Sequence, residues 1–180
     1  MRARIRVISI VALAVLVLTS CAQSEVPKEA GFVPSSCELP DVIQAFDQRL
    51  EGAAFIPTDW QPAEGTDLFD VYELGGIACT YGIESAEIGG TVMWASASDE
   101  FWLEKGTEWT SAGHVAVDIP DLDEHEAYVF ETTSADDQPV WYINFHINGV
   151  WVQFGASKFI TGMEDATAII QAAAKATNNY

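Results

Sequence analysis

The feature that most constrains the fold of this 180-residue chain is the dipeptide Asn148-Gly149, which separates two runs rich in apolar and aromatic residues. The runs extend from Val140 to Ile147 and from Val150 to Ala156. Both positions of a type I′ hairpin loop need a positive φ, which Asn and Gly tolerate better than other residues. The sequence therefore predicts an antiparallel hairpin in which Ile147 pairs with Val150, and this pairing fixes the register along both strands.

The register divides the side chains of the hairpin between two faces. One face is apolar and pairs Phe145 with Val152, Ile143 with Phe154 and Trp141 with Ala156. The opposite face holds aromatic, amide and imidazole side chains: Tyr142, Asn144, His146, Trp151 and Gln153. Such groups offer contact area and hydrogen bonds to sugars, peptides or amphipathic molecules, so an open face here is the candidate ligand surface. The alternative is that a helix, or the segment holding Trp102 and Trp109, covers this face.

Other segments predict helices and strands on both sides of the hairpin. The predicted helices are Pro40 to Leu50, Asp99 to Lys105 and Met163 to Ala176, and the predicted strands are Leu68 to Leu74, Ile77 to Ile83, Thr91 to Ala97, His114 to Ile119 and Tyr128 to Thr133. Residues 53–67 contain Pro and Gly and predict irregular chain, with Trp60 packed over the core. This order predicts an α+β fold, with one largely antiparallel sheet flanked by N-terminal and C-terminal helices.

The first 21 residues have the pattern of a bacterial export signal. Three arginines precede an apolar run from Val7 to Leu18, which is shorter than the roughly 20 residues that a transmembrane helix needs. Leu18-Thr19-Ser20-Cys21 resembles the bacterial lipobox, which implies cleavage before Cys21 and lipidation of its thiol; an ordinary secretory signal is the alternative. We therefore expect a lipoprotein signal peptide over residues 1–20, a lipidated cysteine and flexible tether over 21–36, and a single domain over 37–180.

The two remaining cysteines, Cys37 and Cys79, are predicted to form a disulfide because exported proteins fold in an oxidising compartment. A bond that closes a loop of this length removes chain entropy worth roughly 4 kcal/mol in the simplest model. A catalytic or metal-binding pair is the alternative, but neither cysteine lies in a CxxC motif or near a histidine in the sequence.

The charge of the chain excludes one class of partner. The sequence has 27 Asp and Glu against 8 Lys and Arg, a formal net charge of −19. Residues 1–20 hold three of the basic residues and no acidic ones, so five basic and 27 acidic residues remain after cleavage and the charge becomes −22. A protein of this charge repels phosphate backbones, and we expect no nucleic acid partner.

Several of these features together resemble the small, uncharacterised cell-wall lipoproteins of high-GC Gram-positive bacteria. They are the lipobox, Cys37-Glu38-Leu39-Pro40 at the start of the first helix, Cys79-Thr80-Tyr81, the acidic loop that leads to Glu126-Ala127-Tyr128, and the Ala-rich last helix. The resemblance implies an α/β sandwich similar to the PsbP/Mog1-like domain. It implies no catalytic residues, and the acidic loop departs from the family pattern because it lacks a glycine.

The acidic loop is also the weak candidate for a metal site. Asp118, Asp121, Asp123, Glu124 and Glu126 lie within nine residues and could offer oxygen ligands to Ca²⁺. The loop lacks the glycine of an EF-hand and is stiffened by Pro120, so we expect a solvated connection, with no resident metal and no cofactor.

No catalytic motif is complete in the sequence. Gly155-Ala156-Ser157-Lys158-Phe159 lacks the last glycine of a nucleophile elbow, and His125-Glu126 is followed by Val129 where a zinc protease has its second histidine. We therefore expect a non-enzymatic binding or interaction module at the outer face of the cytoplasmic membrane, anchored by lipid on Cys21, with an unknown protein or small ligand as partner. Two alternatives stay open: an envelope hydrolase that uses His146 or His114 as general base, and a structural accessory subunit of a membrane complex.

Overall fold

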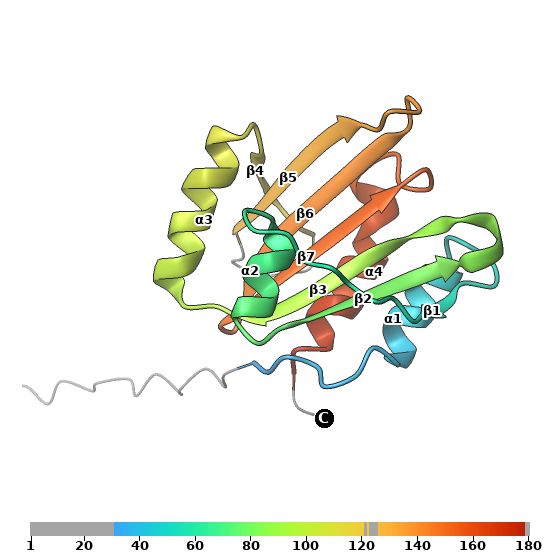
Figure 1. Cartoon of the computed structure of the whole chain (residues 1–180), viewed down its shortest axis with the longest axis horizontal. Coiled ribbons are helices and arrows are strands. Elements are labelled where there is room, and N and C mark those ends of the chain that lie inside the picture. The colour runs from blue at the N-terminus through green and yellow to red at the C-terminus, as the bar shows by residue number, and fades with distance from the viewer. Residues whose placement is uncertain (1–30, 121, 123–125, 179–180) are drawn as a thin grey trace, which may run out of the picture.

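A seven-stranded antiparallel sheet forms the centre of the computed structural model, which describes residues 31–120, 122 and 126–178 (Figure 1). Across the sheet the strands are β1 (Ala54–Ile56), β2 (Ile77–Ile83), β3 (Ile88–Ser96), β7 (Val150–Ser157), β6 (Pro139–Ile147), β5 (Glu126–Thr133) and β4 (Val115–Asp118). The described residues place four α-helices on the two faces of the sheet, which confirms the predicted α+β class.

The helices are divided between the two faces of the sheet. α1 (Pro40–Asp47) and α4 (Met163–Lys175) cover one face, while α2 (Asp67–Glu73) and α3 (Asp99–Ser111) lie on the other (Figure 1). A short 3₁₀ turn, Glu84–Ala86, joins β2 to β3. α2 and α3 both lie toward one end of the sheet, so they leave the other end of their face uncovered (Figure 1).

The hairpin around Asn148-Gly149 has the predicted register. Ile147 pairs with Val150, and φ is +53° at Asn148 and +80° at Gly149. All the predicted pairs along β6 and β7 are present. The face predicted to be apolar packs against α1 and α4, and Ile143, Phe145, Val152 and Phe154 are fully buried in it.

The larger core lies between the sheet and helices α1 and α4, and hydrogen bonds and a disulfide stabilise it together with apolar contacts. Trp94 Nε1 donates to the carbonyl of Ala173 at 3.0 Å and joins β3 to α4. Cys37 and Cys79 form the predicted disulfide, and the hydroxyl of Tyr81 donates to the carbonyl of Cys37 at 2.9 Å. Burial of Tyr81 raises the pKa of its hydroxyl. The disulfide and the Tyr81 hydrogen bond hold Cys37, which precedes α1, against β2.

The smaller core lies under α3 and is mainly aromatic. Trp102 and Trp109 of α3 pack on Tyr128 of β5, and Trp109 also packs on Trp151 of β7. A Cβ at Gly106 would stand 2.6 Å from the Tyr128 hydroxyl, so a glycine is needed for the helix to approach the sheet this closely. The smaller core therefore fixes α3 over β5 and β7.

One predicted strand is wrong, because residues 67–73 form helix α2. Thr66 caps this helix, since its Oγ1 accepts from the Phe69 amide at 3.2 Å, and Asp67 and Asp70 lie in the first turn, where carboxylates favour a helix. Helical spacing brings Val71 into the smaller core. The strand was predicted because Gly75-Gly76 separates two apolar-rich runs, and the cap at Thr66 was overlooked.

Several boundaries also differ from the prediction: α1 ends at Asp47 and β3 begins at Ile88. The segment expected to be irregular contains β1, whose three residues pair with β2, and α3 continues past Lys105 to Ser111. Trp60 packs as expected, at the edge of the smaller core, and its Nε1 donates to the carbonyl of Ala78 at 3.1 Å.

The first described residues are attached beside the β6–β7 turn. The amide of Gly31 donates to the carbonyl of Asn148 at 2.8 Å, and the amide of Phe32 donates to that of Thr177 at 2.9 Å. The predicted signal peptide, Cys21 and most of the predicted tether lie outside the described residues. Within the described residues, no helix has the length and apolar character to cross a bilayer.

Candidate functional site

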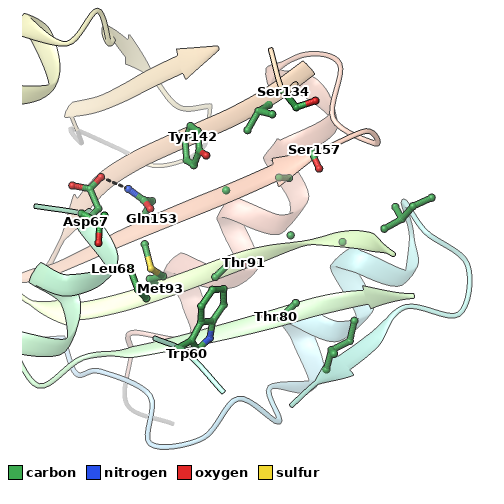
Figure 2. Close-up of a pocket in the computed structure, with 18 of the residues that line it drawn as sticks. Trp60, Asp67, Leu68, Thr80, Thr91, Met93, Ser134, Tyr142, Gln153 and Ser157 are labelled. Atoms are coloured by element: carbon green, nitrogen blue, oxygen red, sulfur yellow. Dashed lines mark hydrogen bonds between the residues drawn. The ribbon is translucent and has the colours of Figure 1, made fainter. Parts of the chain in front are cut away.

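A groove of about 850 Å³ occupies the part of the sheet face that α2 and α3 leave uncovered (Figure 2). Its floor is the middle of β2, β3 and β7, represented by Thr80, Thr91 and Gly155. Trp60 stands at one side and Tyr142 of β6 at the other, while Asp67 and Leu68 of α2 close one end (Figure 2). The volume is within the usual range for a small-molecule site, ~300–1,000 Å³.

Small residues make the floor hollow. A Cβ at Gly155 would stand 3.3 Å from the Tyr142 ring, and a Cβ at Gly89 would stand 2.4 Å from the carbonyl oxygen of Tyr81. Glycine at these positions lets the strands approach and leaves the space above them free. Thr80 and Thr91 form a cross-strand pair and add hydroxyl groups to the floor.

Aromatic side chains form the two walls. Trp60 is held over β2 by its bond to Ala78, and Tyr142, on β6, is 38% exposed. Three interstrand steps separate β2 from β6, which is about 14 Å between backbones. Behind Tyr142 the Phe130 ring lies 6.4 Å away, and the His114 ring stacks on Phe130 at 4.8 Å. A ligand in the groove would therefore lie between two aromatic walls.

The end of the groove beside α2 contains a hydrogen-bonded polar network (Figure 2). Gln153 Nε2 donates to Asp67 Oδ2 at 2.6 Å and to Asn144 Oδ1 at 2.8 Å. Trp109 Nε1 donates to the Asp67 carboxylate at 3.1 Å, and Trp151 Nε1 donates to Asn144 Oδ1 at 2.9 Å. The network fixes the Gln153 amide and the Asp67 carboxylate, which both line the groove.

A buried lysine balances the charge of this network. Lys105 of α3 places Nζ 2.8 Å from Asp67, 2.9 Å from Asp70 and 2.9 Å from Glu108. Burial alone would lower the pKa of Lys105, but the bonds to Asp67, Glu108 and Asp70 outweigh it and the pKa is raised. Lys105 is therefore a cation at neutral pH, and Asp67, Asp70 and Glu108 share its charge.

His114 lines the groove as a largely neutral ring. Burial lowers the pKa of His114, against the opposing attraction of Asp67. Its Nδ1 is buried without a hydrogen-bond partner among the described residues. Packed against Phe130 and Trp109, the imidazole contributes to the aromatic wall, and no described serine or carboxylate bonds to it.

The structure divides the predicted ligand surface into a covered part and an open part. Asn144 and Trp151 are fully buried, and Trp151 packs with Trp109 of α3, so for these two residues the alternative of a covered face holds. His146 is also mostly covered, since Nε2 lies 2.9 Å from the carbonyl of Ala97 and the ring stacks on Trp102. Tyr142 and Gln153 line the groove, and they are the predicted residues that it retains.

The prediction missed Asp67, Leu68, Met93 and Thr91 as members of the site. Leu68 was assigned to a strand and Asp67 to irregular chain. The two faces of β3 were also not matched to those of the hairpin. Once β3 pairs with β7, Met93 lies opposite Gln153 and Thr91 opposite Gly155. The Thr66 cap was the signal that could have identified α2.

The candidate metal ligands are only partly described. Asp118 is the last residue of β4 and Glu126 is the first of β5, and the two residues pair in the sheet. Asp121, Asp123 and Glu124 lie outside the described residues. Within the described ranges, no group of three or more His, Cys, Asp and Glu residues is arranged to hold a metal ion.

Comparison with known proteins identifies no relative that could assign a role to these residues. No protein-family model matches the sequence, and a search of the curated proteins finds no significant match. Function is therefore inferred from the geometry of the groove and from the sequence pattern at the N-terminus.

Proposed function

We propose that this protein is an exported, lipid-anchored binding module, and that a small amphipathic ligand binds in the groove between Trp60 and Tyr142. The lipid is carried by Cys21 and holds the domain at the outer face of the cytoplasmic membrane. Leu18 to Cys21 resemble a lipobox and follow a basic start and an apolar run, which supports export and lipid anchoring. The disulfide between Cys37 and Cys79 is compatible with an oxidising compartment.

The uncovered end of the sheet face is the single observation that carries the binding role. A sheet face normally needs a covering layer, because one face of a half-buried sheet is apolar. Here Tyr142, Met93 and Leu68 line a groove that the described residues leave open. A ligand with an apolar body would cover these side chains, while Gln153 and the hydroxyls of Thr80 and Thr91 would bond its polar groups.

Thermal unfolding in the presence of ligands tests the binding role. The exported full chain, carried in phosphatidylcholine nanodiscs, is heated with uncharged saccharides, short peptides, aromatic amines and alcohols, and Ca²⁺ with and without chelator. A ligand at 100 times its Kd adds about 2.7 kcal/mol to the free energy of unfolding, which is a visible rise in Tm. We expect at least one organic compound to raise Tm.

A pair of matched variants locates the site. Thr91→Trp fills the floor of the groove, whereas Thr107→Trp places the same side chain on the exposed surface of α3. The ligand-induced rise in Tm should disappear in Thr91→Trp and persist in Thr107→Trp. A rise that survives in Thr91→Trp, or a panel with no effect on the unaltered chain, contradicts the groove as the site.

The lipid anchor at Cys21 is tested separately from the groove. Cys21→Ser should release the protein from the membrane fraction, and inhibition of the lipoprotein signal peptidase should leave a precursor of larger mass. A chain that remains membrane-bound after Cys21→Ser contradicts the anchor and leaves the binding role to be decided by the thermal experiment.

A further inference from the structure

We propose that the groove selects cationic amphipathic ligands, which carry an amine or guanidinium on an apolar or aromatic body. This inference rests on the proposed binding role of the groove and specifies its ligand class. Three carboxylates line the groove, from Asp67, Glu84 and Glu87, and the lining contains no Lys or Arg side chain. A cation would therefore be attracted along the whole groove, and an anion repelled.

The carboxylates at the two ends of the groove are not equivalent. Asp67, at the α2 end, is paired with Lys105. Glu84 and Glu87, in the connection between β2 and β3, are exposed and make no ion pair within the described residues. Glu84 and Glu87 are therefore the lining carboxylates that no described cation pairs with, while at the α2 end Lys105 is shared by Asp67, Asp70 and Glu108, so negative charge is left there as well.

One lysine lies near the end formed by the β2–β3 connection and reduces its net negative charge. Lys158 is exposed, and its Nζ donates to the backbone carbonyl of Glu87 at 3.5 Å, but its side chain is not part of the lining. Two carboxylates and one ammonium leave a net charge of −1 there. The formal charge of the chain, −19, or −22 after the predicted cleavage, adds a field of the same sign.

The spacing of the groove fits a ligand with its charge at one end. Met93 pairs with Gln153, which bonds to Asp67. Ile88 is five residues earlier in β3 and lies beside the β2–β3 turn. Five residues of strand extend about 17 Å. An apolar body would lie over Thr91 between the aromatic walls, and its cation would reach Glu84 and Glu87. A cation held nearer the middle would also meet the ring face of Trp60, which attracts positive charge.

The same groove disfavours anionic ligands. A carboxylate or phosphate in it would lose part of its hydration and would find no Lys or Arg in the lining to replace that hydration. Phosphorylated sugars, nucleotides and fatty acids are therefore poor candidates, although their apolar or ring parts could fit.

Three compounds with one apolar body and different charges test the proposal. They are 4-phenylbutylamine, 4-phenylbutanol and 4-phenylbutyrate, titrated by ligand-observed NMR into the exported full chain in phosphatidylcholine nanodiscs, with empty nanodiscs as the blank. At low salt we expect the amine to bind about sevenfold more tightly than the carboxylate, as a local potential of about −1 kT/e implies, with the alcohol between them. In 0.5 M salt the difference should fall to about twofold. Equal affinity for amine and carboxylate overturns the charge selection.

Paired glutamine variants identify the carboxylates responsible. Glu84→Gln with Glu87→Gln removes the unpaired charges at the end of the groove, whereas Glu100→Gln with Glu104→Gln removes two exposed charges from α3, outside the groove. The preference for the amine should fall severalfold in the first double variant and remain in the second. An equal fall in both would assign the preference to the net charge of the protein and overturn the role of Glu84 and Glu87.

The outcomes separate this inference from the proposed function. If all three compounds bind alike and Thr91→Trp abolishes their binding, the groove is a ligand site without charge selection. If the alcohol binds best, the ligand class is neutral. If none of the three binds while a saccharide or peptide of the thermal panel does so in the groove, the cationic class is wrong and the binding role stands.

Discussion

Lys105 Nζ lies 2.8 Å from Asp67 Oδ1, so a lysine of α3 holds the carboxylate that closes one end of the groove. The lysine is buried, with 7% of its side chain exposed, and it also contacts Asp70 and Glu108. Through Asp67 and Gln153 the charge is linked to the floor of the groove. The ion pair therefore joins the smaller core to the candidate site, and changes at Lys105 should affect both.

Replacement of Lys105 should destabilise the fold. Lys105→Met keeps most of the side-chain volume but leaves Asp67, Asp70 and Glu108 close together without a cation. Removal of one partner of a buried pair costs about 3–5 kcal/mol, and the partial exposure of the carboxylates places the expected loss at the lower end, about 3 kcal/mol. Urea unfolding measures it. Lys158→Met, on the exposed surface, is the matched control and should change the free energy of unfolding by less than about 0.5 kcal/mol.

His114 should make stability depend on pH below its ordinary pKa of 6.5. Because burial lowers the pKa of His114 in the folded chain, the unfolded chain binds the proton first as the pH falls. The contribution of the neutral ring is present above pH 6.5 and is lost as the pH falls toward the folded pKa. His114→Phe keeps a ring against Phe130 and should gain stability relative to the unaltered chain between pH 7 and pH 5. An NMR titration that gives His114 a folded pKa of 6.5 or higher would contradict this prediction.

Loss of the disulfide should lower stability without removing the fold's other bonds. Cys37 and Cys79 are 42 residues apart, and the chain-entropy model assigns such a loop about 4 kcal/mol. Cys37→Ala with Cys79→Ala should therefore lower the free energy of unfolding by about 2–4 kcal/mol. Reductant should produce a similar loss in the unaltered chain and none in the double variant. Labelling of both thiols in denatured, unreduced protein would show that the bond does not form.

The hairpin was predictable because its signals are local. Asn148-Gly149 determines the turn, and alternation along β6 and β7 then places every side chain on one of two faces. The larger core follows from the apolar face, because Ile143 and Phe154 have no other place to be buried. The disulfide was predictable as well, because the export signal implies an oxidising compartment and Cys37 and Cys79 are the two cysteines that remain there.

The groove was not predictable in the same way, because it depends on where helices lie on a sheet face. α3 covers Asn144 and Trp151 but not Tyr142, and nothing in the hairpin sequence distinguishes these residues. The position of α3 depends on contacts with Tyr128 that join distant parts of the chain. The Gly75-Gly76 break between two apolar-rich runs also led to a strand being predicted where α2 lies, and Asp67 was assigned to irregular chain.

The attachment of Gly31 beside the Asn148 turn has a mechanical consequence. Gly31, which belongs to the segment predicted to be a tether, lies at the end of β6 and β7 marked by Asn148, whereas the groove extends toward the opposite end of these strands, where Ser157 lines it. A bound ligand that is pulled outward, against a chain anchored at Gly31, would load the sheet lengthwise. The interstrand hydrogen bonds would then share the tension in parallel and resist shear together, so that a pull on the ligand tends to break its own contacts before it unzips the domain.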